Sequence, residues 1–181
     1  MIKTAIWIIA GILLGLIIHL VIILSLPNLV SNNAWNILSK ISTPGKLIIL
    51  KRPKPMEANV LRLDPELVYA VCRFDLLQGP GSLSGKLPSD FWSVGIFDKS
   101  GVAIYSTTNR SGGDQNLDLG IFSPAQTRLL AEHQLTLKTG VIIVKAPSNE
   151  VYAVIRLATP HPAMWQRYKE TLKQLKCAHI K

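Results

Sequence analysis

The chain has 181 residues, a formal net charge of +9 and a hydrophobic content of 48%. Without its apolar N-terminal stretch, about 150 residues remain, enough for one compact domain. The basic residues are scattered, and the sequence contains neither a ribonucleoprotein motif nor zinc-finger spacing, which argues against nucleic acid as a partner. A basic surface of this kind is expected to aid solubility or to attract acidic components of a cell envelope.

An uncharged apolar run covers residues 5–26 and ends before Pro27. A helix of this length spans the hydrocarbon core of a bilayer, which is about 30 Å thick. A cleavable signal peptide has a shorter apolar core followed by small residues at a cleavage site, and residues 27–33 contain no such pattern. A buried core helix is usually shorter and keeps a polar stripe, whereas His19 is the only strongly polar side chain here. We therefore expect an uncleaved transmembrane anchor.

Few positive charges flank this anchor. The α-amino group and Lys3 precede it, and the first basic residues after it are Lys40 and Lys46. Positive residues close to a span tend to stay on the cytoplasmic side. We expect residues 1–4 to lie in the cytoplasm and the C-terminal domain to be exported.

Four residues of the anchor recur at every fourth position and share one face of the helix: Trp7, Gly11, Gly15 and His19. The two glycines form a G-x-x-x-G motif, which lets two helices approach closely in lipid. A helix contact would also hide His19, since an unpaired polar group is costly inside a membrane. Homo- or hetero-association through this face is one interpretation. The other is that the glycine spacing arises by chance and that His19 reaches water near the headgroups.

Residues 27–59 form a connector between the anchor and the domain. Apolar residues at helical spacing in its first half predict a short amphipathic helix, with Trp35 near the headgroups. Residues 46–50 predict a first short strand. Residues 51–59 contain several basic residues and two prolines, which predicts an extended linker.

Residues 60–181 mostly alternate between apolar and polar side chains. The pattern predicts a strand over residues 68–75, with Cys72 on its buried face and Arg73 and Asp75 as a surface pair on the other. Strands at 91–97 and 102–107 form a hairpin whose turn contains Gly101.

The second half of the domain continues with short elements. We expect a strand at 116–122, a short helix from Pro124, and strands at 141–144 and 151–157 that pair with each other. This succession of short strands predicts a mainly β fold, an antiparallel β-sandwich or curled sheet, with one transmembrane helix at the N-terminus and one helix at the C-terminus.

The last helix is expected at residues 163–177, with one apolar stripe flanked by basic residues. It either docks on the sheet with its charges in water, or lies as a basic amphipathic helix on anionic lipid. The second interpretation suits a domain that faces the cytoplasm, because the inner leaflet supplies the anionic surface.

The two cysteines, Cys72 and Cys177, could form a disulfide if the domain is exported. Cys72 should be buried, whereas Cys177 falls opposite the apolar stripe if the last helix reaches it. The two thiols could meet only if the helix ends earlier and its tail folds inward. A disulfide and two separate thiols therefore both stay open.

The sequence contains no recognisable catalytic, cofactor-binding or metal-ligating constellation, and we expect no cofactor. The four histidines lack metal-ligand spacing, and the Gly/Ser-rich residues 79–85 match neither a nucleophile elbow nor a phosphate-binding loop. Residues 114–118 begin like a calcium loop, but a leucine occupies its glycine position.

Several short sequence motifs resemble those of one protein family. They are Asp64-Pro65-x-Leu67, Ala70–Leu76, Gly79-Pro80, Leu87-Pro88, Phe91–Asp98, Gly101 and Ile104-Tyr105-Ser106. Together they make the chain similar to short bacterial membrane-anchored proteins of the family known as domain of unknown function twelve-fifty-four. The resemblance implies a bacterial inner-membrane protein with a β-rich periplasmic domain, and it supplies no catalytic residues.

We therefore expect a single-pass envelope protein whose periplasmic domain binds or scaffolds an envelope protein or glycan, and which is not an enzyme. A first alternative is an envelope hydrolase or carbohydrate-active enzyme with a site in the loops at 78–84 and 109–114. A second is a cytoplasm-facing domain that binds anionic lipid through its basic C-terminal helix.

Overall fold

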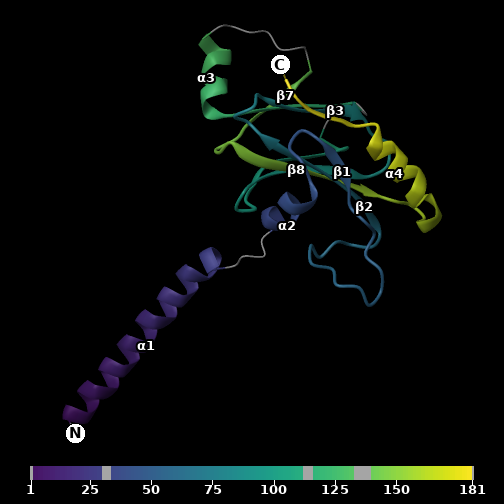
Figure 1. Ribbon diagram of the computed structural model, residues 1–181. Coiled ribbons are helices and arrows are strands. Elements are labelled where there is room, and N and C mark those ends of the chain that lie inside the picture. The colour runs from purple at the N-terminus through teal and green to yellow at the C-terminus, as the bar shows by residue number, and fades with distance from the viewer. Residues whose placement is uncertain (1, 30–33, 112–115, 133–139, 181) are drawn as a thin grey trace.

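The computed structural model describes residues 2–29, 34–111, 116–132 and 140–180. Its elements in chain order are α1 (Ile2–Leu29), α2 (Ala34–Ile41), β1 (Leu47–Ile49), β2 (Leu67–Asp75), β3 (Gly81–Lys86), β4 (Trp92–Asp98), β5 (Ala103–Thr108), β6 (Asn116–Phe122), α3 (Pro124–Glu132), β7 (Ile142–Lys145), β8 (Glu150–Ala158), a 3-10 turn (Pro162–Met164), α4 (Trp165–Lys173) and β9 (Lys176–His179). The strands of the described residues form two sheets, which Figure 1 shows as the body of the molecule. The five-stranded sheet A has the order β1-β2-β8-β4-β5, and the four-stranded sheet B has the order β7-β6-β3-β9. The predicted mainly β fold is confirmed, with an apolar helix at one end of the chain and a helix near the other.

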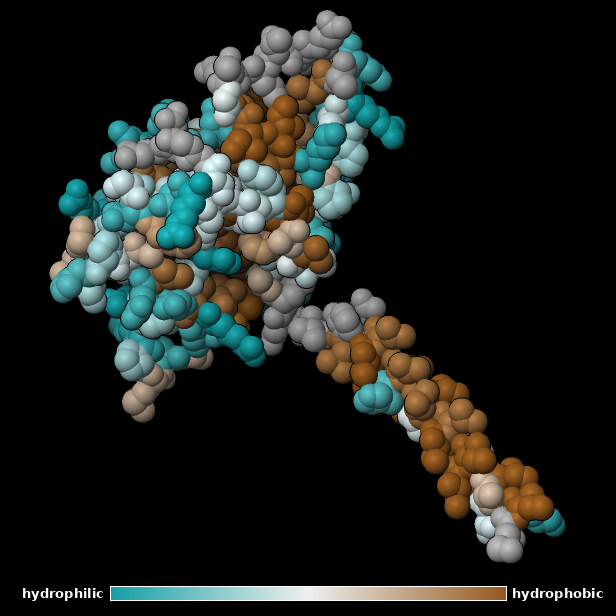
Figure 2. All heavy atoms as spheres, turned by 180° about the vertical axis from the view of Figure 1, so that it is seen from behind, coloured by the Kyte–Doolittle hydropathy of each residue, from teal (hydrophilic) through white to brown (hydrophobic). Residues whose placement is uncertain are grey.

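Helix α1 is apolar on all sides. Its large side chains from Ile2 to Leu26 are exposed, and no residue in that range is buried. Figure 2 shows it as a rod covered by hydrophobic residues. In length and composition it can cross a membrane, as expected for residues 5–26.

Sheet A is antiparallel, with β8 between β2 and β4. The predicted hairpin is confirmed as β4–β5, and Gly101 adopts a φ of 88° in its turn, a conformation that glycine takes without a steric cost. The carboxylate of Asp98 accepts hydrogen bonds from the backbone N–H of Val102 and the hydroxyl of Ser100. Burial acts to raise the pKa of Asp98, but these bonds outweigh it and lower the pKa below its usual value. The carboxylate therefore closes the turn.

Sheet B contains a difference from the sequence-based expectation. Strand β7 pairs with β6 in parallel and does not pair with β8, so the expected 141–144/151–157 hairpin is wrong. Parallel neighbours need a crossover connection, and the connection between β6 and β7 contains α3. The turn at 146–149 then carries the chain from sheet B to sheet A.

Strand β3 occupies a central position in sheet B, between β6 and β9, although its Gly/Ser-rich sequence gives no strand pattern. Packing explains the composition. A Cβ atom on Gly81 would lie 2.7 Å from the ring of Phe74, so a larger residue would collide with the core.

The main core lies between the two sheets, and α4 closes one side of it with Tyr168, Leu172 and the following Leu175. The helix ends at Lys173, so the expected helix over residues 163–177 is too long. Residues 176–179 instead form β9, which pairs with β3. Without β9, β3 would be an edge strand, and the pairing satisfies backbone hydrogen bonds of β3 that would otherwise be left to water.

A second apolar layer lies on the outer face of sheet A. Helix α2 packs there through Trp35 and Leu38, against Tyr69, Val71 and Tyr152. Both faces of β2 are therefore buried, and Arg73 is only 9% exposed, with its guanidinium 4.9 Å from the centre of the Trp35 ring. The expected surface pair of Arg73 and Asp75 is wrong, because α2 covers that face of the strand.

Candidate functional site

The central strands of sheet A build the floor of a pocket on the outer face. The register places Tyr69 beside Arg156, Val71 beside Val154, and Tyr152 beside Phe97. Side chains of alternate residues point to the same face, so these six project away from the main core. Helix α2 covers one part of the face, and residues 61–63 cover another.

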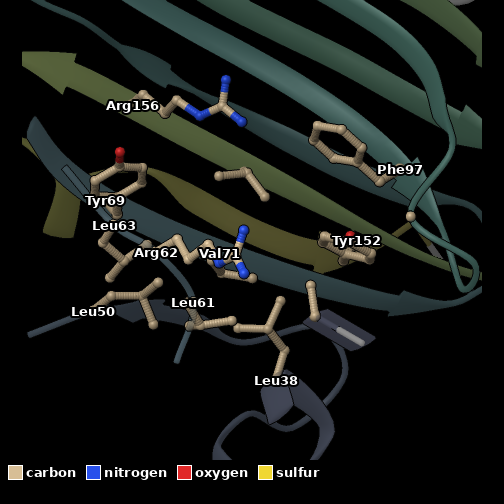
Figure 3. A pocket seen from close by; sticks show the side chains of 13 residues that line it. Leu38, Leu50, Leu61, Arg62, Leu63, Tyr69, Val71, Phe97, Tyr152 and Arg156 are labelled. Atoms are coloured by element: carbon tan, nitrogen blue, oxygen red, sulfur yellow. The ribbon is translucent and has the colours of Figure 1, made fainter. Parts of the chain in front are cut away.

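Between these two covers lies a cavity of about 320 Å³. Its lining residues come from α2, the segment before β2, and sheet A: Ala34, Leu38, Leu50, Leu61, Arg62, Leu63, Tyr69, Val71, Phe97, Gly101, Tyr152, Val154 and Arg156. Figure 3 shows leucine side chains on one side of it, and Phe97 and Tyr152 together on another. Apolar walls with a few polar groups are typical of small-molecule sites.

Two guanidinium groups border this cavity. Arg156 extends from β8 and Arg62 from the covering segment, and both residues are exposed enough to remain hydrated and charged (Figure 3). Arg62 has a φ of 49°, which is rare for a residue other than glycine. The side chain of Asn59 fixes this turn, since it accepts from the N–H of Leu63 at 2.8 Å and donates to the carbonyl of Leu63 at 2.7 Å. The turn thus holds Arg62 at the cavity.

Two tyrosines add hydroxyl groups. The hydroxyl of Tyr69 accepts a hydrogen bond from the N–H of Asp64 at 3.1 Å and keeps its own proton as a donor. Burial, and then the charge of Asp98, raise the pKa of Tyr152, while the positive charge of Arg156 opposes this shift. The raised pKa keeps Tyr152 protonated near neutral pH, and both hydroxyls can donate to an acceptor.

A larger apolar groove of about 650 Å³ adjoins the cavity. It runs between α2, β1 and residues 51–63, and it shares Leu50, Leu61 and Leu63 with the cavity. The three leucines therefore form a wall between the two hollows.

A third hollow, of about 370 Å³, lies between α4 and the segment before β4. Here the hydroxyl of the buried Tyr168 donates to the carboxylate of Asp90. Burial, this hydrogen bond and the negative charge of Asp90 raise the pKa of Tyr168 to about 12, against the opposing charge of Arg167. A phenol with so high a pKa is a poor base or nucleophile, so we interpret this pair as structural.

The loops considered for a hydrolase do not come together as a site among the described residues. Residues 81–84 belong to β3, and Asn109 donates to the carbonyl oxygens of Ser89 and Asp90. Asp75 and Asp98 each accept from turn groups of their own loop. Asp114 lies outside the described residues. Within those ranges, no group of three or more His, Cys, Asp and Glu side chains is placed to hold a metal ion.

The transmembrane association face lies along α1. Trp7 is 78% exposed, and a Cβ atom on Gly11 or Gly15 would meet no atom within 4 Å. The space that a second helix needs is thus open beside both glycines. Association through this face, including His19, stays a prediction.

Cys72 and Cys177 are joined by a disulfide, with their Cα atoms 6.3 Å apart. Cys72 lies on β2 of sheet A and Cys177 on β9 of sheet B, so the bond crosses the main core. The sequence argument against the bond assumed a helix through Cys177, and the strand in its place turns that residue inward.

Sequence reasoning missed the pocket residues Arg62, Tyr69, Tyr152 and Arg156. Arg62 and Tyr69 come from neighbouring segments, whereas Tyr152 and Arg156 come from the distant strand β8, and no spacing connects the two pairs. One signal was available, because the predicted amphipathic helix that became α2 needs an apolar surface to cover.

The comparisons with known proteins agree with this fold. The model of a family described as "Protein of unknown function (DUF1254)" matches residues 44–179. The crystal structure of the VPA0106 protein from Vibrio parahaemolyticus is similar, with a TM-score of 0.57 and 12% identity over 82% of this chain and 35% of that chain. A crystal structure of an uncharacterized protein from Burkholderia cenocepacia gives a TM-score of 0.40 and 11% identity over 65% of this chain and 30% of that one. The comparison with curated proteins gives no match. The chain thus spans about a third of the length of the structures that it resembles.

Proposed function

The chain belongs to the family of proteins of unknown function DUF1254, and we propose that it is a single-pass inner-membrane protein of the bacterial envelope with a periplasmic, non-catalytic binding domain. The apolar helix α1 supports the membrane anchor. Lys3 before the apolar run of residues 5–26, and the uncharged stretch after that run, support an exported domain.

The pocket on the outer face of sheet A is the observation that points to binding. Its walls are apolar, and its polar groups are the guanidinium groups of Arg62 and Arg156 and the hydroxyls of Tyr69 and Tyr152. All of these groups donate hydrogen bonds, and two are permanently positive. A ligand that matches them has an apolar body and one carboxylate, sulfonate or phosphate group.

The same lining supports binding in preference to catalysis. Among the described residues, the lining includes no Asp, Glu, His, Cys, Ser or Lys to act as nucleophile or general base. An arginine does not lose its proton near neutral pH, and Tyr152 keeps its proton because its pKa is raised.

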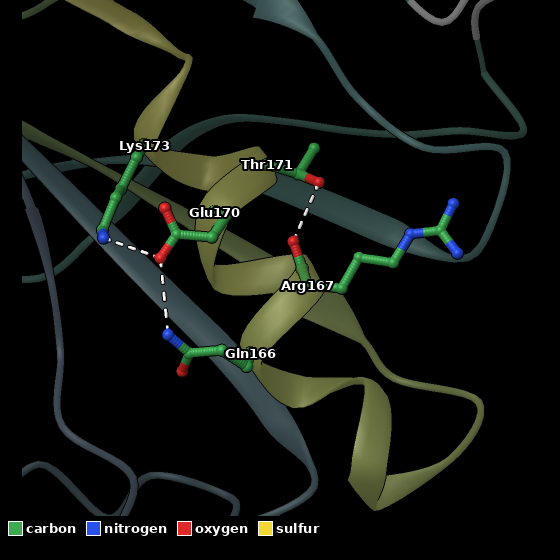
Figure 4. A network of polar contacts seen from close by, with 5 residues as sticks. All are labelled: Gln166, Arg167, Glu170, Thr171 and Lys173. Atoms are coloured by element: carbon green, nitrogen blue, oxygen red, sulfur yellow. Dashed lines mark hydrogen bonds and ion pairs between the residues drawn. The ribbon is translucent and has the colours of Figure 1, made fainter.

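The lipid-binding alternative through α4 has less support. Figure 4 shows that Glu170 takes part in two contacts on the outer side of this helix, at 2.7 Å to Lys173 and 3.4 Å to Gln166. The carboxylate neutralises part of the positive face that an anionic lipid surface would need.

The test uses the full chain in maltoside micelles and three probes with one shape: 2-naphthoate, 2-naphthol and 2-naphthylmethylammonium. Isothermal titration, corrected with empty micelles, should give the tightest binding for the anion. A charge-assisted hydrogen bond contributes about 1.5 kcal/mol or more, so naphthoate should bind about tenfold more tightly than naphthol.

Variants locate the binding. Arg156→Gln and Arg62→Gln should reduce the preference for naphthoate, and Val154→Trp should fill the cavity and weaken all three probes. Arg128→Gln on α3, which is exposed away from the pocket, is the matched control and should change nothing. Equal binding of the three probes by the unaltered chain would contradict the proposal, as would full binding by Val154→Trp.

A further inference from the structure

We infer that one surface of the domain lies against the anionic phospholipid headgroups of the bilayer that α1 spans. This membrane-proximal face consists of Lys40, Ile41, Lys51, Lys54, Met56 and Val60, on α2 and the segment between β1 and β2. The inference rests on the proposed membrane span, and it requires anionic phospholipid in the leaflet that the domain faces.

The length of the chain keeps this face close to the membrane. Leu29 ends α1 and Ala34 begins α2, so five Cα steps connect them, at most about 18 Å when fully extended. The polar region on each side of the hydrocarbon is about 5–8 Å thick. Helix α2 therefore lies within or just above the headgroups.

The segment between β1 and β2 lies beside α2. Both line the apolar groove, α2 with Ile37 and Ile41 and the segment with residues 51–63. In Figure 1 the segment hangs below the sheets on the side of the body where α2 lies, while α3 occupies the far end. A bilayer that reaches α2 is thus also near this segment.

Apolar side chains project from this face into solvent. Met56 is fully exposed, and Val60 and Ile41 are 62% and 54% exposed. Met56 has a φ of 67° in a turn closed by the N–H of Glu57 donating to the carbonyl of Lys54 at 3.2 Å. Single exposed apolar residues are common, but here Ile41 and Val60 line one groove and Met56 projects from the segment that borders it. Together with the lysines they form the pattern of an interfacial surface.

The charge of this part of the chain is strongly one-sided. Residues 27–63, which follow the span, contain six Lys or Arg and one acidic residue, which gives +5 of the total of +9. Lys40, Lys51 and Lys54 are all exposed, and the acidic residue Glu57 lies 3.8 Å from Lys54 in a solvated pair. Basic residues close to a bilayer are attracted to anionic lipid, and this attraction decays within a Debye length.

The test compares lipid contact at two exposed apolar positions. The full chain is reconstituted in nanodiscs of phosphatidylcholine with or without one-third phosphatidylglycerol, with the photo-crosslinker p-benzoylphenylalanine replacing Met56 or Leu77. Leu77 is 78% exposed and follows β2 at the other end of that strand, so it is the matched control. Mass spectrometry measures the fraction of protein that is joined to lipid.

We expect at least fivefold more lipid adduct at Met56 than at Leu77, and a further increase with phosphatidylglycerol. Lys40→Gln, Lys51→Gln and Lys54→Gln together should reduce the adduct at Met56 at least threefold. A triple substitution of Arg167, Lys169 and Lys176 by Gln removes the same charge from the other basic region and should leave it unchanged.

Three results would overturn the inference. Equal yields at Met56 and Leu77 in chains that co-elute with the discs would refute this face alone and leave the anchor intact. Loss of the adduct in the α4–β9 triple variant, with no change in the lysine triple variant, would assign the contact to the C-terminal region. Elution of the chain apart from the discs would refute the membrane span, and with it the proposed function.

Discussion

Single side chains hold distant segments of this fold together, and the pair of Tyr168 and Asp90 is one such contact. Tyr168 is 4% exposed and lies on α4, and Asp90 lies just before β4. The hydrogen bond therefore links the C-terminal helix to the start of a central strand of sheet A. Because Asp90 is charged, the bond is of the stronger kind.

Replacing Tyr168 by Phe should lower the free energy of unfolding by about 1–2 kcal/mol at pH 7, since the bond to a charged acceptor is lost. The folded-state pKa of Tyr168 is raised to about 12, above the usual value of about 10 for a tyrosine. Its contribution is therefore complete below pH 10 and is lost as the pH rises toward 12.

Urea unfolding of the full chain in micelles between pH 8 and 12 measures this difference. The difference in free energy of unfolding between the unaltered chain and Tyr168→Phe should become smaller above pH 10. Tyr105→Phe on β5 is the control. A gap that stays constant across this range would show that the phenol does not couple folding to its ionisation.

Among the elements, α2 has the most specific attachment. Its eight residues are too few to be stable as an isolated helix, so packing on sheet A must hold it. Trp35 lies 6.0 Å from the ring of Tyr152 and under the guanidinium of Arg73. The hydroxyl of Ser42 donates to the carbonyl of Leu38 at 2.6 Å and closes the last turn.

Trp35→Ala should therefore release α2 while the sandwich remains folded. Loss of a large buried aromatic side chain costs about 3 kcal/mol or more. This exceeds the free energy that is expected to hold so short a helix on the sheet. Hydrogen exchange of the backbone amides of α2 should become fast, and exchange in β2 and β8 should stay slow. Ile41→Ala on the exposed side of the same helix is the control, and slow exchange of α2 in Trp35→Ala would contradict this account.

At the scale of the whole molecule, the disulfide indicates the compartment in which the domain is folded. Cys72 and Cys177 are separated by 105 positions, and their bond joins sheet A to sheet B. A disulfide of this kind persists in an oxidising compartment such as the periplasm and is reduced in the cytosol. The state of the thiols therefore reports on which side of the membrane the domain lies.

We predict that both thiols are blocked in cells. Acid-trapped protein, treated with a maleimide–polyethylene glycol reagent under denaturing conditions, should shift on a gel only after reduction. The double variant Cys72→Ala/Cys177→Ala should lose about 3–5 kcal/mol of stability, because the long loop is no longer closed in the unfolded chain. Two labelled thiols without reduction would place the domain in the cytosol and contradict the proposed periplasmic location.

Local patterns in the sequence predicted the elements whose structure depends on neighbours along the chain. These elements are the apolar helix α1, the β4–β5 hairpin with Gly101, and the short amphipathic helix α2. The period-two alternation also predicted the buried face of β2 that contains Cys72. Each of these signals lies within one segment and needs no knowledge of what packs against it.

Only the tertiary structure decided the rest, because contacts between distant segments determine it. Position 81 of β3 requires a glycine because the ring of Phe74 leaves no room for a side chain, and Arg73 is buried because α2 covers it. Strand β7 pairs with β6 in parallel, a contact between two strands that α3 separates in the sequence. The pocket has the same origin: Arg62, Tyr69 and Arg156 meet only where a covering segment and two strands converge, and no spacing in the sequence encodes that meeting.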